Sequence, residues 1–327
     1  MQAKTKTHLE LNIIPFEKEF EQKNRPVITI GMFDGVHIGH QSLISDLKEK
    51  AKELNTIPII ITFDNHPQLA LKPKNLDKIS LLQTNEERFT KLHLQGINDI
   101  ITIHFTKEFS QIKAEDFIDL LLKKYNPQYL LLGYDNHFGN KSFQDFDKLV
   151  IASKEKGLIL KRSKSCVFYD NIEVSSTQIR KALAAGNIKL ANAMLNEDYL
   201  ISGQVEHGNK IGTKLGYPTA NLKIDRHKLL PLFGVYITEV EFNEKTYQGI
   251  VSIGIRPTIN KDIVNEEKTP RVEVNIFDFH EDVYGKKIKL RLKDFIREEI
   301  KFDDLDSLKA KINKDIEKAK LYFKTNE

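Results

Sequence analysis

The sequence contains very little that would allow disulfide bonds or membrane insertion. Among its 327 residues Cys166 is the only cysteine, so no disulfide can form within the chain, which is typical of a reducing compartment. The apolar runs, such as residues 57–61, are far too short to cross a bilayer. The first residues lack the apolar core of a secretory signal peptide. These absences predict a soluble, cytoplasmic protein.

An excess of charge of one sign is lacking as well. The chain has 50 Lys and Arg against 46 Asp and Glu, a net charge of +4 at pH 7. So small an excess argues against nucleic acid or a membrane as the main partner. Neither G-x-x-x-x-G-K-S/T nor G-x-G-x-x-G occurs, so a P-loop and a dinucleotide-binding fingerprint are absent. We therefore expect small-molecule substrates, and any kinase chemistry must use another architecture.

The first half of the chain alternates between strand and helix patterns. Apolar residues recur at helical spacing between the predicted strands, and Thr84 with Glu87 forms a plausible capping box for one helix. Such alternation predicts a parallel sheet covered by helices. The predicted strands span residues 27–33, 57–63, 100–105, 129–132 and 158–161.

The pattern changes near residue 186, where a short helical stretch to about Tyr199 is followed mainly by strand patterns. These predict a small β-barrel or sandwich closed by a helix that begins near Leu305 and covers one side. A chain of this length predicts about two domains. We expect domains at 1–186 and 200–327 with a connector at 187–199. The predicted strands span 201–205, 235–242, 247–253, 271–279 and 288–292, with a hairpin turn at 243–245.

The segment Gly31–His40, GMFDGVHIGH, has the features of a phosphate-binding turn. A strand ends, glycines allow a tight turn, and a helix is expected to begin near His40. A helix N-terminus presents free N–H groups and a partial positive charge to phosphate. His37 and His40 can donate hydrogen bonds to phosphoryl oxygens, and phosphoryl-type transfer depends on such positioning and charge stabilisation. Two histidines at this spacing are usually surface turn residues, but strand, glycines and helix together favour a function.

A second motif, VSSTQIR, lies at residues 174–180. Ser176 or Thr177 can cap a helix that runs to about Ala185. Arg180, one turn into that helix, would then be placed to bind the β- or γ-phosphate of ATP. An ordinary capped helix with a solvated arginine is the alternative.

These motifs resemble the HIGH nucleotidylyltransferase superfamily, within which two branches compete. Class I aminoacyl-tRNA synthetases carry a KMSKS-like loop, to which KRSKS at 161–165 is similar. Bacterial bifunctional riboflavin kinase/FAD synthetases carry G-x-F-D-G-V-H-x-G-H, which Phe33-Asp34-Gly35 matches better. TFDNHP at 62–67 and GYDNHFG at 133–139 also resemble motifs of this second family. Asn65 stands in place of a family proline and Asn136 in place of an aromatic residue, which affects the expected geometry of the flavin pocket.

The resemblance implies a set of site residues in the first half. His37, His40 and Arg180 would be catalytic, with the histidines stabilising developing charge and the arginine holding pyrophosphate. Asp135 lies just past a predicted strand end, where ligands of parallel sheets bind. By resemblance Asp135 and Asn136 would contact the flavin. The implied ATP contacts are Gly31, Phe33, Asp34, Gly39, His66, Ser176 and Thr177.

A glycine-rich stretch at 203–221 opens the second half. Composition alone predicts a glycine loop with a Pro-Thr turn, in which Thr219 and Asn221 offer oxygen ligands suited to Mg²⁺. The end of this stretch, LGYPTAN, closely resembles the riboflavin kinase signature. Thr213 replaces a basic residue that is common there, so the phosphate contact of that residue is either missing or made by Lys210 or Lys214. The resemblance implies Mg²⁺ at Thr219 and Asn221 and ATP contacts at Gly208, Gly212, Lys214 and Pro218.

The strand at 271–276 alternates strictly between apolar and polar residues. Val272 and Val274 share one face, whereas Glu273 and Asn275 share the other. A strand carboxylate is usually only solvated, but Glu273 can also accept a proton from a hydroxyl nucleophile. The resemblance implies that Glu273 is the catalytic base. Residues 297–302 resemble the family's flavin-side loop, which implies a flavin contact at Arg297.

The resemblance extends from about Val27 to Phe323, with the motifs of both halves in the family's order. It implies an α/β fold: a Rossmann-like HIGH-type nucleotidylyltransferase domain followed by a small β-barrel kinase domain with a C-terminal helix. The expected reactions use ATP and Mg²⁺ to convert riboflavin to FMN and FMN to FAD. A synthetase-like adenylate-forming enzyme and a non-catalytic flavin-binding regulator remain alternatives. A monomer is compatible with the sequence, which does not fix the oligomeric state.

Overall fold

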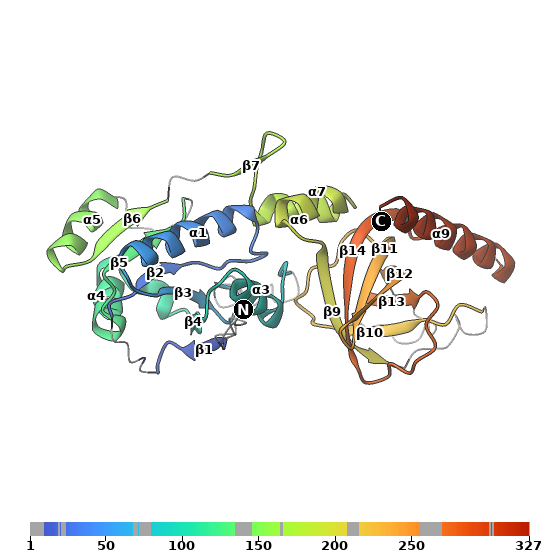
Figure 1. Cartoon of the computed structure of the whole chain (residues 1–327), viewed down its shortest axis with the longest axis horizontal. Helices are drawn as coiled ribbons and strands as arrows, with labels where there is room; N and C mark the ends of the chain where they lie inside the picture. The colour runs from blue at the N-terminus through green and yellow to red at the C-terminus, as the bar shows by residue number, and fades with distance from the viewer. Residues whose placement is uncertain are drawn as a thin grey trace, which may run out of the picture. The chain divides into compact units, whose positions relative to one another are not determined.

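The computed structural model describes residues 10–18, 20, 24–67, 71, 80–134, 146–163, 166–207, 216–255, 270–300, 302 and 304–326. The chain divides into two compact units, which are described here one at a time (Figure 1). The first unit comprises residues 1–79 and 83–174, and the second comprises residues 80–82 and 175–327.

The first unit contains a six-stranded sheet in the order β1-β4-β3-β2-β5-β6, in which every neighbouring pair is parallel. The central strand β2 is buried along its whole length. The strands are β1 (Asn12–Pro15), β2 (Val27–Ile30), β3 (Pro58–Phe63), β4 (Asp99–Ile103), β5 (Tyr129–Leu132) and β6 (Ile159–Arg162).

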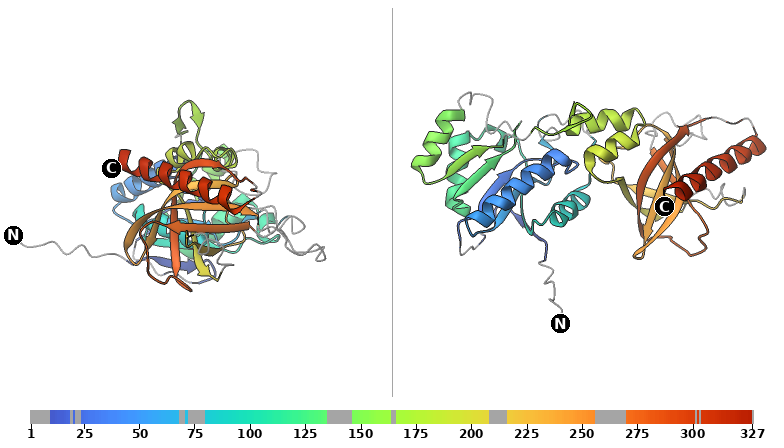
Figure 2. Two further views of the ribbon diagram at one scale, coloured as in Figure 1. Left: turned by 90° about the vertical axis from the view of Figure 1, so that its right-hand side faces the viewer. Right: turned by 45° about the horizontal axis from the view of Figure 1, so that its top comes forward.

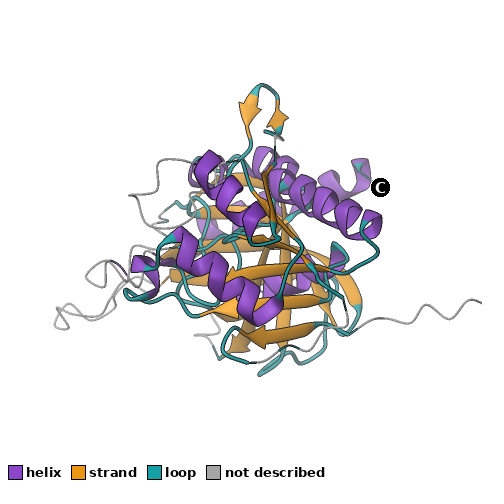
Figure 3. Ribbon diagram, turned by 90° about the vertical axis from the view of Figure 1, so that its left-hand side faces the viewer, coloured by secondary structure: helices purple, strands orange, loops and turns teal. Residues whose placement is uncertain are grey.

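Helices cover both faces of this sheet, because successive strand residues point to opposite faces (Figures 1 and 3). On one face Ile60 and Leu131 pack with Leu47 of α1 (Ile38–Glu53) and Leu92 of α3 (Asn85–Leu94). On the other face the remaining strand residues pack with α4 and α5, so the unit has a core on each side of the sheet. These helices span Ala114–Tyr125 (α4) and Phe146–Glu155 (α5), and a 3-10 turn, η2, spans Phe109–Gln111.

The predicted α/β alternation of the first half is confirmed. The capping box is also confirmed, since Thr84 Oγ1 accepts from Glu87 N and Glu87 Oε2 accepts from Thr84 N. Besides the short turn η2, one strand and one hairpin were not predicted. Strand β1 is a short, largely exposed edge strand without a buried run. The hairpin of β7 (Phe168–Tyr169) and β8 (Ile172–Glu173) projects as a two-stranded arm (Figures 1 and 3).

The second unit is built on a closed antiparallel barrel in the order β10-β13-β12-β11-β14-β9. Residues such as Ile201, Tyr236 and Val274 are fully buried, and their alternation along the strands fills the barrel with side chains. Of the two architectures predicted for the second half, a barrel or a sandwich, the structure shows the barrel. Its strands are β9 (Tyr199–Glu206), β10 (Ala220–Ile224), β11 (Gly234–Phe242), β12 (Lys245–Ile255), β13 (Pro270–Ile276) and β14 (Lys287–Glu298).

Two local features of the barrel bear on the sequence predictions. Asn243 and Glu244, with φ of 48° and 61°, join β11 to β12, as expected for a tight two-residue hairpin turn. Strand β10 was not predicted as a strand, because its residues belong to the Pro-Thr-Ala-Asn motif, which has turn chemistry in isolation.

The C-terminal helix α9 (Leu305–Thr325) lies along the outside of the barrel (Figures 1 and 2). Its last turns bury Ala319 and Phe323 against Val235 and Ile250. Leu305, which was expected to belong to the covering face, is instead 63% exposed, because α9 packs through its C-terminal half.

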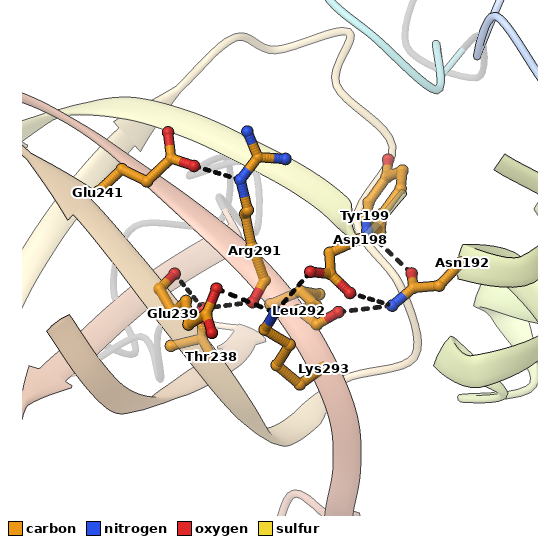
Figure 4. Close-up of polar contacts among 9 residues, drawn as sticks. All are labelled: Asn192, Asp198, Tyr199, Thr238, Glu239, Glu241, Arg291, Leu292 and Lys293. Atoms are coloured by element: carbon orange, nitrogen blue, oxygen red, sulfur yellow. Dashed lines mark hydrogen bonds and ion pairs between the residues drawn. The ribbon is translucent and has the colours of Figure 1, made fainter. Parts of the chain in front are cut away.

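Two shorter helices, α6 (Ser176–Ala184) and α7 (Ile188–Leu195), also belong to the second unit. Asn192 of α7 donates to Leu292 O at 2.8 Å and accepts from Tyr199 N at 2.8 Å (Figure 4). Lys293 lies between Asp198 and Glu239, at 2.7 and 2.9 Å (Figure 4). These contacts fasten α7 to the barrel.

The boundary between the two compact units falls between residues 174 and 175, just before α6. Within the described residues, no helix combines the length and apolarity needed to span a bilayer.

Candidate active sites

The two histidines of the first motif lie where the turn after β2 leads into α1: His37 ends the turn, and His40 belongs to the first turn of the helix. Helix α1 begins at Ile38, two residues before the predicted start near His40, and His37 is its N-cap. His37 Nδ1 accepts from His40 N at 3.4 Å, which places the ring hydrogen of neutral His37 on Nε2. Since β2 is parallel to its neighbours, this turn lies at the carboxyl edge of the sheet, where ligands of such folds bind.

The backbone of this turn is strained. Phe33 and Val36 adopt φ of 51° and 39°, together with Gly35 at 88°. A left-handed conformation is rare for a β-branched residue such as valine and costs about 1–3 kcal/mol. Val36 N donates to Phe33 O at 3.1 Å across the turn. Glycines were expected to provide this bend, but only Gly35 does so, and two bulky residues share the strain.

The two histidine rings stack on one another, with centroids 3.7 Å apart and an interplanar angle of 19°. Phe33 packs against the His40 ring at 5.1 Å. A Cβ at Gly39 would lie 3.2 Å from the His37 ring, so glycine leaves room for this stack. The residues Phe33, His37, Gly39 and His40, predicted from one motif, thus form one compact cluster. Gly31 adjoins the Phe33 ring, and Asp34 is 4% exposed and accepts from Gln83 N at 3.3 Å.

The pKa of His40 is held well below 6.5, first by burial and then by electrostatic interaction with His37, Lys91 and Arg88. Among the described residues its buried Nδ1 has no hydrogen-bond partner. His40 is therefore a neutral hydrogen-bond donor and not a cation at physiological pH.

We expect His40 to stay neutral when the protein is titrated down to about pH 6. Unfolded His40 binds a proton below its ordinary pKa of 6.5, whereas folded His40, with its lowered pKa, binds one only at a lower pH. Its contribution thus lowers the stability of the first unit as pH falls below about 6.5 and is absent above it. Imidazole nitrogen NMR of the ¹⁵N-histidine protein, assigned with His40→Gln, measures this titration. A midpoint near 6.5 for His40 would contradict the assignment.

The loop after β3 carries the third predicted histidine. Asn65 Nδ2 donates to Phe105 O at 2.9 Å, and its Oδ1 accepts from Phe105 N at 2.7 Å. A proline side chain cannot make this pair of hydrogen bonds. Asn65, which stands where the resembled motif has proline, therefore links the loop after β3 to the loop after β4. His66 follows directly and is half-buried. The loop therefore holds His66 at the same carboxyl edge of the sheet as His37.

The VSSTQIR motif differs from the prediction at its cap. Ser175 caps helix α6, since its side chain accepts from Gln178 N at 3.3 Å, so the expected cap at Ser176 or Thr177 is wrong. Ser176 and Thr177 occupy the first turn instead. Arg180 Nε donates to Ser80 O at 3.4 Å within the second unit.

Glu273 lies on the outer face of the barrel, because its neighbours Val272 and Val274 are buried inside. In the ladder it stands opposite Asn221 on β10 and opposite Ser252 on β12. Directly opposed residues in a sheet share a face and lie within contact distance. Arg271 Nη1 lies 3.6 Å from Glu273 Oε1. The structure thus brings together Glu273 and Asn221, which belong to separate predicted motifs.

The residues directly before β10 are held against the outer face of the barrel that carries Glu273. Asn275, 9% exposed, donates from Nδ2 to Pro218 O at 2.8 Å. This bond places Pro218 and the adjoining Thr219 beside the outer face of β13. The hydroxyl, amide and carboxylate oxygens of Thr219, Asn221 and Glu273 are hard donors, which fit Mg²⁺.

The predicted flavin residue Arg297 is engaged by the C-terminal helix. Its Nε and Nη2 lie 2.8 Å from Asp315 Oδ2, and Asp315 is 2% exposed. The neighbouring Glu299 carboxylate lies close to the place that a Cβ at Gly254 would occupy, so a side chain there would require the exposed Glu299 carboxylate to shift. Gly254 pairs with Arg271, so Glu299 approaches the face that carries Glu273.

Comparison with known proteins matches each half of the chain to an enzyme family. A family model described as FAD synthetase matches residues 19–178, and one described as Riboflavin kinase matches residues 195–323. A bifunctional riboflavin kinase/FMN adenylyltransferase of Haemophilus influenzae is 36% identical over 90% of this chain and 94% of its own. The corresponding protein of Escherichia coli K12 is 34% identical over 91% and 92%. The chain belongs to the bifunctional riboflavin kinase/FMN adenylyltransferase family.

One solved structure is similar to this chain over almost its whole length. It is titled as a macrolide-efflux protein from Streptococcus pneumoniae, and it is 30% identical with a TM-score of 0.82, covering 94% of this chain and 98% of that one. The predicted fold class is confirmed in both halves: a parallel Rossmann-like sheet with helices, and a closed barrel with a C-terminal helix. The family also confirms the expected enzyme class.

Several residues expected from the family resemblance lie outside the described residues, and their roles stay predictions: Asp135, Asn136, Gly208, Gly212, Thr213 and Lys214. Sequence reasoning missed Arg88, Lys91 and Asn275, all buried polar residues beside the predicted sites. Only Asn275 could have been found from the sequence, because the alternation of apolar and polar residues along 271–276 placed it on the same strand face as Glu273.

Proposed function

We propose that the two activities of this family are carried out at separate sites, adenylyl transfer in a domain at 1–186 and riboflavin phosphorylation in a domain at 200–327, with a connector at 187–199. The observation that supports this most directly is the presence of two unrelated motif clusters, one at the β2–α1 turn and one on the β10–β13 face. Either cluster alone has the donors for one transfer reaction and lacks those for the other.

At the barrel site, Glu273 would take the proton of the riboflavin 5′-hydroxyl. The freed oxygen attacks the γ-phosphorus of ATP while the bond to the β–γ bridging oxygen breaks, which yields FMN and ADP. Asn221 stands opposite Glu273 in the ladder, and Asn275 holds the Pro218 carbonyl, so the side chains meet on one face. Mg²⁺, held by Thr219 and Asn221, would neutralise phosphate charge there.

At the β2–α1 turn, a phosphate oxygen of FMN would attack the α-phosphorus of a second ATP, with pyrophosphate as the leaving group. His37 and His40 would donate hydrogen bonds to the oxygens on which charge develops. Backbone N–H groups at the start of α1 add a partial positive charge. Arg180 would hold the leaving pyrophosphate.

The remaining assignments extend the family resemblance to single residues. We propose ATP contacts at Gly31, Phe33, Asp34, Gly39 and His66, together with Ser176 and Thr177. The flavin would contact Asp135, Asn136 and Arg297, and ATP at the barrel would contact Gly208, Gly212, Lys214 and Pro218. A cytoplasmic location, the absence of nucleic-acid and membrane partners and a monomeric state belong to the same proposal.

Pure protein incubated with riboflavin, ATP and Mg²⁺ is expected to form FMN first and FAD afterwards, with release of ADP and then pyrophosphate. Chelation of the metal should stop riboflavin phosphorylation, because phosphoryl transfer depends on neutralised phosphate charge. Chromatography of the flavins and nucleotides follows both steps. Flavin binding without conversion would indicate a non-catalytic regulator, and amino-acid-dependent exchange of pyrophosphate into ATP would indicate a synthetase-like enzyme; either outcome overturns the proposal.

A further inference from the structure

Two basic side chains of α3 are buried against the β2–α1 turn. Arg88 is 1% exposed and Lys91 is 6% exposed, and they lie one helical turn apart. Charged side chains are rarely buried to this extent unless their donors are used. Neither residue belongs to a predicted motif, and neither takes part in the reaction steps above.

Arg88 joins the ends of two neighbouring parallel strands. Its Nη1 donates to Met32 O at 2.9 Å, in the turn after β2. Its Nη2 donates to Phe63 O, at the last residue of β3, and to Asn85 Oδ1 at 2.9 Å. One planar guanidinium therefore fixes the spacing of the two loops that carry the predicted histidines.

Lys91 holds the other side of the same turn, since its Nζ donates to Gly35 O at 3.1 Å. The two residues with strained backbone, Phe33 and Val36, lie between or beside these anchored carbonyls. Unfavourable backbone conformations persist only where the surroundings over-determine them. The anchors from α3 supply that constraint.

We propose that Arg88 is a positioning residue for adenylyl transfer, which holds the turn in the strained conformation that presents His37 and His40. Lys91 secures the second carbonyl of the turn. This role rests on the function proposed for the first unit. Arg88 acts through the backbone of the turn and not on the substrate.

Charge and shape both matter for this role. Burial lowers the pKa of Arg88 to about 10, against the opposing effect of Asp34 and Asp64, so the side chain remains charged at neutral pH. Asp34 lies in the turn after β2 and Asp64 in the loop after β3. A lysine at position 88 would keep the charge but not the planar fork that reaches both loops.

The test compares Arg88→Gln and Arg88→Lys with the wild-type full chain. We expect Arg88→Gln to lower kcat for FAD formation by about a hundredfold, since a small misplacement of catalytic groups has effects of this size. The KM for ATP should change by less than about threefold, because the histidines act mainly on charge that develops in the transition state. Arg88→Lys should recover part of kcat. Riboflavin phosphorylation in the same preparation should be unchanged.

Arg25 provides a matched control, because it also donates hydrogen bonds to several backbone carbonyls. It donates to Asn126 O, Pro127 O and Gly157 O at 3.1, 2.9 and 2.8 Å, but it precedes β2 and so lies at the opposite edge of the sheet. Arg25→Gln is expected to lower thermal stability without lowering kcat, when both are assayed well below the unfolding midpoint. An equal loss of kcat in Arg25→Gln and Arg88→Gln at matched stability overturns the role.

The outcomes separate this role from the proposed function. A wild-type chain that forms FAD beside an Arg88→Gln variant with full kcat overturns the positioning role alone. A wild-type chain that forms no FAD overturns the proposed function and this role with it. If Arg88→Gln does not fold, Arg88→Lys decides, since wild-type kcat in that variant shows that the fork is not needed.

Discussion

Replacement of His40 by alanine is expected to lower the rate of FAD formation by about 10²- to 10³-fold, the usual effect of removing one preorganised donor to a developing oxyanion. His40 is fixed by its stack on His37 and by its contact with Phe33, and burial keeps it neutral. A neutral imidazole donates one directed hydrogen bond without reorganisation. Riboflavin phosphorylation should be unchanged, because Glu273 and Asn221 belong to the other unit.

The measurement follows FAD from supplied FMN and FMN from riboflavin in the same preparation. His93→Ala is the matched control, because His93 lies at the far end of α3, where its Nδ1 approaches Ile97 O at 3.2 Å. That variant should retain both activities. Loss of both reactions in His40→Ala would contradict the assignment of the histidine pair to one step.

The turn and its histidines could be predicted because their signals are local. A buried strand, two histidines at a fixed spacing and a following amphipathic helix are all visible within residues 27–54, and the capping box of α3 is visible in Thr84 and Glu87. The start of α1 was misjudged by two residues because His37 is an unusual N-cap. The cap of α6 was misjudged because three consecutive side chains, Ser175 to Thr177, are all good N-caps.

The buried cations could not be predicted, because their environment is made by distant parts of the chain. In the sequence Arg88 and Lys91 are ordinary polar positions of an amphipathic helix. Their burial depends on carbonyls of Met32, Gly35 and Phe63, which only the tertiary fold brings to α3. The left-handed conformation of Val36 has no sequence signal either, since valine disfavours it.

The barrel site was predicted in part. Alternation along β13 placed Glu273 and Asn275 on one face, and the structure confirms that arrangement. The pairing of Glu273 with Asn221 depends on strand register between β10 and β13, which a single sequence does not reveal. The bond from Asn275 to Pro218 depends on the same register.

Replacement of Glu273 by glutamine should lower the rate of riboflavin phosphorylation by about 10²- to 10⁴-fold, the usual contribution of a general base. Glutamine keeps the size and polarity of the side chain but cannot accept the hydroxyl proton. FAD formation from supplied FMN should remain intact. Initial rates of both steps, measured at saturating ATP and Mg²⁺, test this expectation.

Glu241→Gln is the matched control for this change. Glu241 is also a barrel-strand carboxylate paired with an arginine, Arg291, and its side chain is 29% exposed against 22% for Glu273 (Figure 4). Loss of that ion pair should reduce stability by about 1 kcal/mol or less and leave both reactions unchanged. If Glu241→Gln slowed FMN formation as much as Glu273→Gln, the effect would come from the barrel's ion pairs and not from proton transfer. If Glu273→Gln kept full kinase activity, the base would have to be another group, and the Glu299 carboxylate, which lies over Gly254 near the same face, would be the next to replace.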